Sequence, residues 1–257
     1  RQWVSVRMAG RVEPDWQQLA HQSDVAVLAV ARHRRKLKRG VHRGNRFVLV
    51  LRELTGEREA IESRLRHLSL HGAPNYFGEQ RFGRNGSTLA QAKTWMASGG
   101  RRISRNKRSI YLSVLRSQMF NTLLADRVSA GDWNQVLPGD TCVLQGTRSQ
   151  FTCEQADADI VQRCFVGDLH PALPLWGLGV ERLSASLLER WSDVLEQQAA
   201  IGDFLIHQGL ELGQRPTRLI ADDFCWQFCD DGSLQLEFRL AAGNYATALL
   251  AEFVQYG

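Results

Sequence analysis

The sequence lacks the patterns that mark several protein classes. It has no run of about 18 apolar residues, so no transmembrane helix is expected. Its five cysteines have no C-x-x-C spacing and its histidines form no H-x-H or H-E-x-x-H pattern. Neither a disulfide framework nor a metal site is therefore expected. A P-loop motif (G-x-x-x-x-G-K-[ST]) and a serine-hydrolase motif (G-x-S-x-G) are also absent, which excludes those two enzyme classes.

Signal sequences are also missing from the first residues. The opening "RQWVSVRM" alternates polar and apolar side chains and lacks the basic start and apolar centre of a secretory signal. A cytoplasmic protein with reduced, buried thiols is therefore expected. A monomer is expected as well.

Acidic residues are scarce in the first half of the chain. Residues 1–120 contain 24 Lys and Arg but only 8 Asp and Glu, a net charge of +16. The remaining residues carry a net charge of −11, which brings the 257-residue chain to +5. Such segregation favours binding to a polyanion, and nucleic acid is the leading partner. A charged but merely solvated surface is the alternative.

The hydrophobic pattern predicts strands near both ends and helices in between. The clearest strand is "RFVLVLREL", and the clearest helix is "SIYLSVLRSQMFNTLLADRV", whose apolar residues recur every three or four positions. Ser87 is a candidate cap for a short helix. The expected elements are strands at 2–7, 24–31 and 46–54; helices at 57–70, 87–97 and 109–128; short strands at 142–145 and 150–153; turns up to 180; helices within 181–208; and a last helix at 244–255.

A β-hairpin is expected close to the C-terminus. The segment "DFCWQFCDDGSLQLEFRLAAG" alternates polar and apolar residues on both sides of the turn pair Asp231-Gly232. Strands thus gather at the two ends of the chain, around a middle rich in helices and turns. The simplest arrangement is α+β, with one sheet domain built from both ends and a second domain inserted between them.

Two basic runs are candidates for phosphate binding. The run "RHRRKLKRGVHRGNR" (32–46) contains eight Arg and Lys, and "RRISRNKRS" (101–109) precedes the long predicted helix. Phosphate contacts provide affinity without sequence choice and weaken with salt. A solvated loop is the alternative for the first run. The residues expected to contact RNA are Arg32, Arg34, Arg35, Lys36, Arg39, Arg43, Arg102, Arg105, Lys107 and Arg108.

The stretch "PNYFGEQRFG" (74–83) combines rings, amides and a cation on a bend with two glycines. Aromatic rings stack on exposed bases, and amides or Arg contact base edges and phosphates. The alternative is that Phe77 and Phe82 anchor the loop in the core. The loop residues expected to bind RNA are Asn75, Tyr76, Phe77, Gln80 and Arg81.

No catalytic group is evident from residue spacing alone. The pairs Asp222-Asp223 and Asp230-Asp231 fall at a strand end and at the hairpin turn, where Asp is favoured for local hydrogen bonds. These four residues are therefore interpreted as structural.

Four segments together resemble one family. "RGNRFVLVLRE", "GAPNYFGEQRFG", "RNKRSIYLSVLRSQMFN" and "LAAGNYATALL" occur in the order found in the tRNA pseudouridine synthase D (TruD) family. The resemblance implies an isomerase that converts a D-arm uridine of tRNA, position 13 in the bacterial enzymes, into pseudouridine. It implies one Asp nucleophile and neither cofactor nor metal. Asn45 would lie beside that Asp, Phe47 would contact the target uracil, and Tyr245 would line the same pocket.

The chain departs from the family pattern at one place. The family's nucleophile lies in a segment of the type G-x-K-D-x-x-A-x-T-x-Q, and only its end is matched, by Arg1-Gln2. The nucleophilic Asp is therefore expected upstream of Arg1, and the chain as given is expected to be inactive. A non-catalytic RNA-binding protein with the same fold is the alternative.

The resemblance also implies a fold and its division into domains. A mixed, mostly antiparallel sheet domain would comprise residues 1–70 and 220–257. A helix-rich insertion domain would comprise residues 71–219. The tRNA would bind in the cleft between them.

Overall fold

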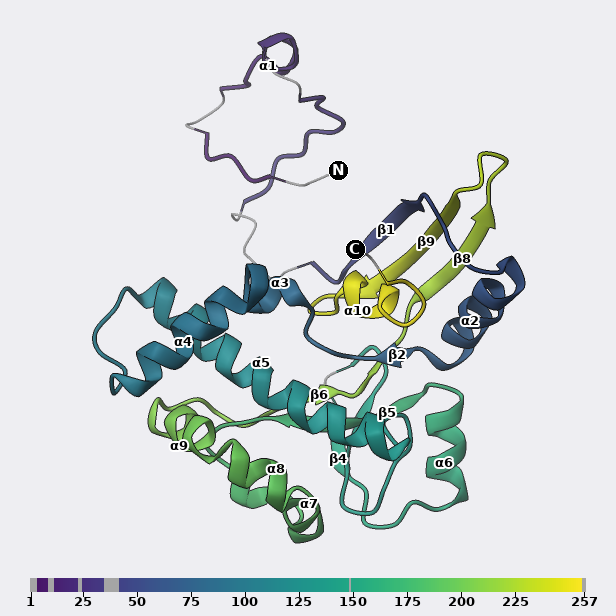
Figure 1. The fold of residues 1–257 in the computed structure, drawn as a ribbon. Coiled ribbons are helices and arrows are strands. Elements are labelled where there is room, and N and C mark those ends of the chain that lie inside the picture. Colours follow the sequence, from purple (N-terminus) through teal and green to yellow (C-terminus); the bar gives the residue numbers. More distant parts are fainter. Residues whose placement is uncertain (1–3, 9–11, 23–24, 35–41, 148, 256–257) are drawn as a thin grey trace. The chain divides into compact units, whose positions relative to one another are not determined.

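The computed structural model describes residues 4–8, 12–22, 25–34, 42–147 and 149–255 (Figure 1). The chain divides into two compact units, Arg1–Arg43 and Gly44–Gly257. The secondary structure is a mixture of helices and antiparallel sheets, so the α+β prediction is confirmed. No helix within the described ranges is both long enough and apolar enough to span a bilayer.

The described residues of the first unit include one short helix, α1 (Trp16–Gln22). The carboxylate of Asp15 accepts hydrogen bonds from the backbone N–H groups of Gln17 and Gln18 at its start. The strands predicted at 2–7 and 24–31 are wrong where the chain is described, because residues 4–7 and 25–31 are irregular. An alternating pattern forms a strand only where a neighbouring strand binds its backbone groups, and neither segment has such a neighbour among the described residues.

The second unit contains a three-stranded sheet made from distant parts of the chain. It joins β1 (Gly44–Leu51), β9 (Leu234–Ala241) and β8 (Asp222–Phe228) in the antiparallel order β1-β9-β8. Figure 1 shows the blue strand β1 beside the yellow-green strands β9 and β8. The predicted hairpin turn is confirmed: Asp231 Oδ1 accepts hydrogen bonds from the backbone N–H and the hydroxyl of Ser233.

One face of this sheet is covered by two helices. Alternate residues of β9, from Leu234 to Leu240, are fully buried. They pack with Leu65 and Leu68 of α2 (Arg58–His71) and with Leu249 of α10 (Ala246–Leu250). The helix predicted at 57–70 is confirmed, whereas α10 is shorter than the predicted 244–255.

A four-stranded sheet lies within the middle of the sequence. Its antiparallel order is β4 (Gln150–Thr152), β3 (Thr141–Leu144), β5 (Leu169–Leu175) and β6 (Gly213–Pro216). The pattern predicted β3 and β4 but assigned β5 to turns, because of Pro171 and Pro174. The strand forms nonetheless, since proline carbonyls still accept hydrogen bonds: Pro171 O accepts from the N–H and the hydroxyl of Thr217.

The long helix α5 (Arg105–Ala130) packs against this sheet and against neighbouring helices. It is longer than predicted and includes half of the second basic run. Ser104 accepts a hydrogen bond from the N–H of Lys107 at its start, and Gly131 ends it with φ 74°. The remaining elements are β2 (Ala73–Pro74) paired with β7 (Arg218–Leu219), α3 (Glu79–Phe82), η1 (Arg84–Gly86), α4 (Ser87–Ala97), α6 (Ala158–Phe165), η2 (Val180–Arg182), α7 (Ala185–Arg190), α8 (Ser192–Gln197) and α9 (Ala199–His207).

Two helix predictions require correction. Ser87 does not cap α4; the cap is Gly86, whose φ of 72° is left-handed, and Ser87 is the first helical residue. The helix α6 was not predicted, although Asp157 caps it by accepting a hydrogen bond from the N–H of Ile160.

A buried ion pair fixes the C-terminal end of α5. The Arg127 guanidinium is fully buried and donates to both carboxylate oxygens of Asp140, each at 2.8 Å. It also donates to Asp132 and to the carbonyl of Gln135. Removing either partner would leave an unpaired buried charge, so this network ties α5 to the segment that leads into β3.

Buried His170 on β5 should make folding sensitive to mild acid. Burial lowers the pKa of His170 to about 4, and the Arg218 cation adds to the effect. The unfolded chain therefore binds a proton between about pH 6.5 and pH 4 that the folded chain does not bind. The free energy of unfolding should therefore decrease as the pH is lowered from about 6.5 to 4, by about 3 kcal/mol at most.

Urea unfolding of wild type and His170→Gln at a series of pH values measures this contribution. The variant lacks the titrating ring, so its free energy of unfolding should decline less steeply between pH 6.5 and 4. Equal slopes for the two proteins would contradict the buried, neutral state of His170.

Candidate functional site

Strand β1 places two of the predicted site residues on one face of the sheet. Side chains alternate along a strand, so Asn45 and Phe47 project to the same side. Phe47 lies opposite Phe238 of β9, and the two rings stack with centroids 5.3 Å apart. Asn45 is exposed and Phe47 is half-buried. The N-x-F spacing thus places the Asn45 amide beside the Phe47 ring, and one face of that ring packs on Phe238.

Tyr245 is positioned by the start of α10. It is the residue that precedes the helix and is half-buried. Its ring packs against the same apolar cluster as Phe47, and it contacts Phe77 at a centroid distance of 6.0 Å. The structure therefore brings Phe47 and Tyr245, which are far apart in sequence, to one cluster.

The loop at 74–83 is packed inside the protein, where it contacts both β6 and α5. Asn75 and Phe77 are 2% and 8% exposed. The Asn75 amide donates to the carbonyl of Pro216, and the backbone N–H and C=O of Phe77 both bond with the side chain of Asn121 on α5. The Phe77 ring meets the edge of Phe120 on α5 at 5.4 Å.

This burial corrects part of the predicted RNA surface. The side chains of Asn75 and Phe77 are occupied within the protein, so for Phe77 and likewise for Phe82 the structure favours the core alternative. Tyr76 is half-buried, and burial raises the pKa of its hydroxyl. Gln80 is exposed, and half-buried Arg81 donates to Ser113 on α5.

Gly78 lies close to the start of α10. It is at the turn into α3, and a Cβ there would clash with the hydroxyl of Thr247 on α10 unless that side chain rotated. The absence of a side chain at this position therefore lets the loop lie directly against the start of α10, next to Tyr245.

Arg215 on β6 holds this region together and was not found by sequence reasoning. It is 8% exposed and donates to three neutral acceptors: Asn75 O at 3.2 Å, Asn75 Oδ1 at 2.6 Å and Gly243 O at 3.0 Å. Its guanidinium lies 4.0 Å from the centroid of Phe77, a cation–π contact. No carboxylate among the described residues is within ion-pair distance of it.

The setting of Arg215 is costly for a cation. Burial lowers its pKa to about 10, and the nearby Arg81 cation acts in the same direction. Hydrogen bonds offset part of the cost of burying a charge, and those of Arg215 join several segments of the chain. Here those segments are the loop at Asn75, strand β6 and the chain at Gly243, which leads to Tyr245.

Only part of the first basic run is described. Arg32 forms an ion pair with Glu13, while Arg34 and Arg43 are exposed. Arg35, Lys36 and Arg39 lie outside the described residues.

The second basic run was predicted to precede the long helix. Instead, its residues from Arg105 onward form the start of α5. Arg102, Arg105, Lys107 and Arg108 are all exposed. Lys107 lies over the Tyr111 ring, and Arg108 donates to the backbone and side chain of Gln208. The first turn of α5 has no acidic residue. Cations are disfavoured at a helix N-terminus, so the helix dipole does not account for these side chains.

Of the two acidic pairs that were interpreted as structural, the local hydrogen bond is confirmed for Asp231, while Asp223 makes an ion pair with a neighbouring strand. Asp223 forms an exposed ion pair with Arg239, and Asp231 bonds to Ser233, which lowers the pKa of Asp231.

Comparisons with known proteins place this geometry in context. The family model "tRNA pseudouridine synthase D (TruD)" matches residues 1–91 and 87–253. The tRNA pseudouridine synthase D of Methylococcus capsulatus is 43% identical over 255 residues, covering 99% of this chain and 72% of the relative. That of Nitrosococcus oceani is 42% identical over 258 residues, with 99% and 71% covered.

A solved structure has a similar fold. The putative tRNA pseudouridine synthase D of Methanosarcina mazei superposes with a TM-score of 0.67 at 16% identity, covering 95% of this chain and 76% of the other. At that identity the likeness concerns the fold alone.

Replacing Arg215 should destabilise the protein strongly. Arg215→Met would leave three acceptors on Asn75 and Gly243 without their donor, which predicts a loss of about 2–4 kcal/mol in the free energy of unfolding. Arg215→Lys should recover only part of this loss, because an ammonium cannot reproduce the planar guanidinium geometry.

Arg239→Met is the matched control in denaturant unfolding. Arg239 is also a strand arginine, but its ion pair with Asp223 is exposed, so its loss should cost less than about 1 kcal/mol. Similar losses for the Arg215 and Arg239 variants would contradict the assigned role of Arg215.

Proposed function

This chain belongs to the tRNA pseudouridine synthase D (TruD) family, and we propose that its native protein isomerises a D-arm uridine of tRNA to pseudouridine. The observation that carries the proposal is the arrangement of Asn45, Phe47 and Tyr245. Two of these residues share a face of β1, and Tyr245 packs with Phe47 on the same apolar cluster. An amide and two half-buried aromatic rings suit the binding of a flat, polar base that has been extruded from the RNA stack.

The proposed reaction needs positioning more than redox or metal chemistry. The N1–C1′ bond of the uridine breaks, the uracil turns, and C5 bonds to C1′. The proton lost from C5 is balanced by one gained at N1, so the product is an isomer. Phe47 would hold the uracil face through this turn and Tyr245 would close the pocket. Asn45 would donate a hydrogen bond to the nucleophilic carboxylate.

The nucleophile itself is assigned outside these residues. Asp223 and Asp231 are engaged in local bonds at exposed positions, as described above. The family's Gly-x-Lys-Asp segment is the proposed source of the carboxylate, and the 257 residues contain no such pattern. The chain as given is therefore expected to bind tRNA without isomerising it.

The proposed tRNA path follows the division into domains at about residues 70 and 220. The three-stranded sheet draws on 44–51 and 222–241, while the four-stranded sheet lies within 141–216. The cations at the start of α5, together with Gln80 and Arg81, would contact the RNA backbone. Asn75, Phe77 and Arg215 would hold the two parts in place.

A non-catalytic RNA-binding protein is the second candidate, and the absence of a Gly-x-Lys-Asp pattern from the 257 residues favours it. Release of tritium from tRNA carrying 5-tritiated uridine separates the two. A protein that includes the Gly-x-Lys-Asp segment should release tritium, and the 257-residue chain should bind the same tRNA without release. A folded longer protein that binds tRNA but releases none would contradict the proposed activity.

Phe47→Leu should impair turnover more than tRNA binding. The ring would contact one extruded base, and such a contact contributes about 1–3 kcal/mol. Turnover of the longer protein should therefore fall by about tenfold or more, whereas affinity, spread over many phosphates, should change by less than about twofold. Single-turnover rates and tRNA titrations provide the two numbers.

Leu49→Ala is the control, because Leu49 lies on the same strand and face and packs on the same cluster. It should lower stability without lowering the turnover of folded protein. Equal losses of binding and turnover in Phe47→Leu would make Phe47 a core residue only.

The cations at the start of α5 should determine much of the salt dependence of tRNA binding. Combined replacement of Arg102, Arg105 and Lys107 by Ala should flatten the slope of log K against log salt by up to about three units, if each side chain neutralises one phosphate. Replacing Arg58, Arg64 and Arg66 on α2 removes the same charge and should alter the slope less. A slope that responds equally to both triple variants would remove the α5 start from the RNA path.

A further inference from the structure

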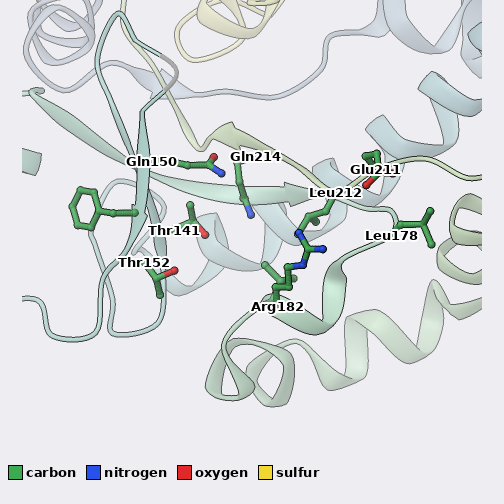
Figure 2. Close-up of a pocket in the computed structure, with 10 residues that line it drawn as sticks. Thr141, Gln150, Thr152, Leu178, Arg182, Glu211, Leu212 and Gln214 are labelled. Carbon is green, nitrogen blue, oxygen red and sulfur yellow. The ribbon is translucent and has the colours of Figure 1, made fainter.

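A polar pocket lies on the four-stranded sheet, apart from Asn45, Phe47 and Tyr245. Its volume is about 280 Å³, near the lower end of small-ligand pockets. Figure 2 shows labelled side chains from both sheet and loops around one space. The lining residues are Thr141, Gln150, Phe151, Thr152, Leu178, Arg182, Leu183, Glu211, Leu212 and Gln214.

The pocket has a fixed backbone frame. Thr141 of β3 and Thr152 of β4 are directly paired, and Gln214 projects from β6 on the other side of β5. The segment that carries Leu178 is bound to the chain before β6, by hydrogen bonds between Leu178 and both Leu210 and Leu212. Gly177 allows this approach, because a Cβ there would clash with the carbonyl of Leu210. The polar side chains are therefore held by three strands of a sheet and a bonded loop.

One acceptor in this pocket has no partner. The Gln214 Oε1 atom is buried and accepts no hydrogen bond from any residue that the structure describes. A buried acceptor without a donor costs free energy, and a ligand N–H or O–H group would remove that cost.

The pocket is also lined by a cation, Arg182. The Arg182 side chain is 82% exposed, and its nearest acidic neighbour, Glu181, is at the 4.0 Å limit of an ion pair. In Figure 2 the Arg182 guanidinium and the amides of Gln150 and Gln214 point toward the same space. The pocket thus has a charged donor for an anion at its edge, and beside it an unpaired acceptor that a turn of the Gln214 amide would bring to a neutral donor.

We propose that this pocket binds one nucleotide of the RNA substrate, at a distance from the target uridine. Arg182 binds its phosphate, the Gln214 amide turns so that Oε1 reaches the pocket and accepts from a base N–H or a ribose hydroxyl, and Gln150 with the paired threonines provides further polar contacts. A simple anion has no donor for Gln214, whereas a nucleotide carries both an anion and donors. The inference rests on the proposed function for the identity of the ligand as RNA.

Glu211 also lines the pocket, and its negative charge allows a test of whether the ligand is an anion or a cation. Its carboxylate opposes an anion, so the phosphate is placed at Arg182 and not at Glu211. Neutralising Glu211 should strengthen RNA binding, while neutralising Arg182 should weaken it. A pocket that bound a cationic partner would show the opposite pattern.

The experiment is a salt titration of tRNA binding to the 257-residue chain and four variants. Arg182→Gln should lower affinity by about three- to tenfold and flatten the log–log salt slope by about one unit. Gln214→Leu, of similar shape, should lower affinity several-fold without changing the slope. Glu211→Gln should raise affinity. Arg66→Gln on α2, an exposed arginine paired with Glu62, is the charge-matched control and should leave both quantities near wild type.

The outcomes separate this inference from the function on which it rests. Wild-type affinity and slope retained in Arg182→Gln and Gln214→Leu, with melting confirmed as cooperative, would overturn the nucleotide pocket alone. A wild-type chain that does not bind tRNA would overturn the proposed function and the pocket with it. Weaker binding in Glu211→Gln would also contradict the assigned placement of the phosphate.

Discussion

The arrangement of the candidate site depends on one buried guanidinium. Arg215 has been removed from water without a carboxylate to compensate it among the described residues, and its hydrogen bonds go to Asn75 and Gly243. Desolvation lowers its pKa to about 10, which is still high enough for the charge to persist at neutral pH. The cost of burying it is offset by hydrogen bonds that order the loop at Asn75 and the chain at Gly243 against β6.

Two of these segments connect Arg215 to the rest of the structure, one to the candidate site and the other to α5. Gly243 is followed by Tyr245 and α10, whose apolar side packs on the sheet that carries Phe47. Asn75 is followed by Phe77, which bonds to Asn121 and packs on Phe120 of α5. The exposed cations at the start of that same helix are therefore connected through packed elements to the rings assigned to the target base. Packing of the loop 74–83 against β6 and α5 explains its residues better than direct contact with RNA does.

Local patterns predicted much of the second unit and little of what depends on distant contacts. The strand within 46–54, the helix within 57–70 and the hairpin at Asp231-Gly232 are specified by periodicity and turn residues near one another in sequence. Strand β5 was missed because Pro171 and Pro174 usually mark turns, and only the neighbouring strands show that their carbonyls are used. The roles of Asn75 and Phe77 could not be predicted, because their partner Arg215 is 140 residues from Asn75. The N-x-F pair and Tyr245 were found only through a family resemblance.

The target uridine is proposed to lie against Phe47 and Tyr245. Photo-cross-linking can test this position, with tRNA that carries 5-bromouridine at the target position and a mass-spectrometric search for the modified peptide. Cross-links are expected in residues 44–51 or 243–250, and they should be lost when Arg215 is replaced by Lys. Cross-links confined to other segments, such as 141–152 or 211–214, would contradict the assignment of the site.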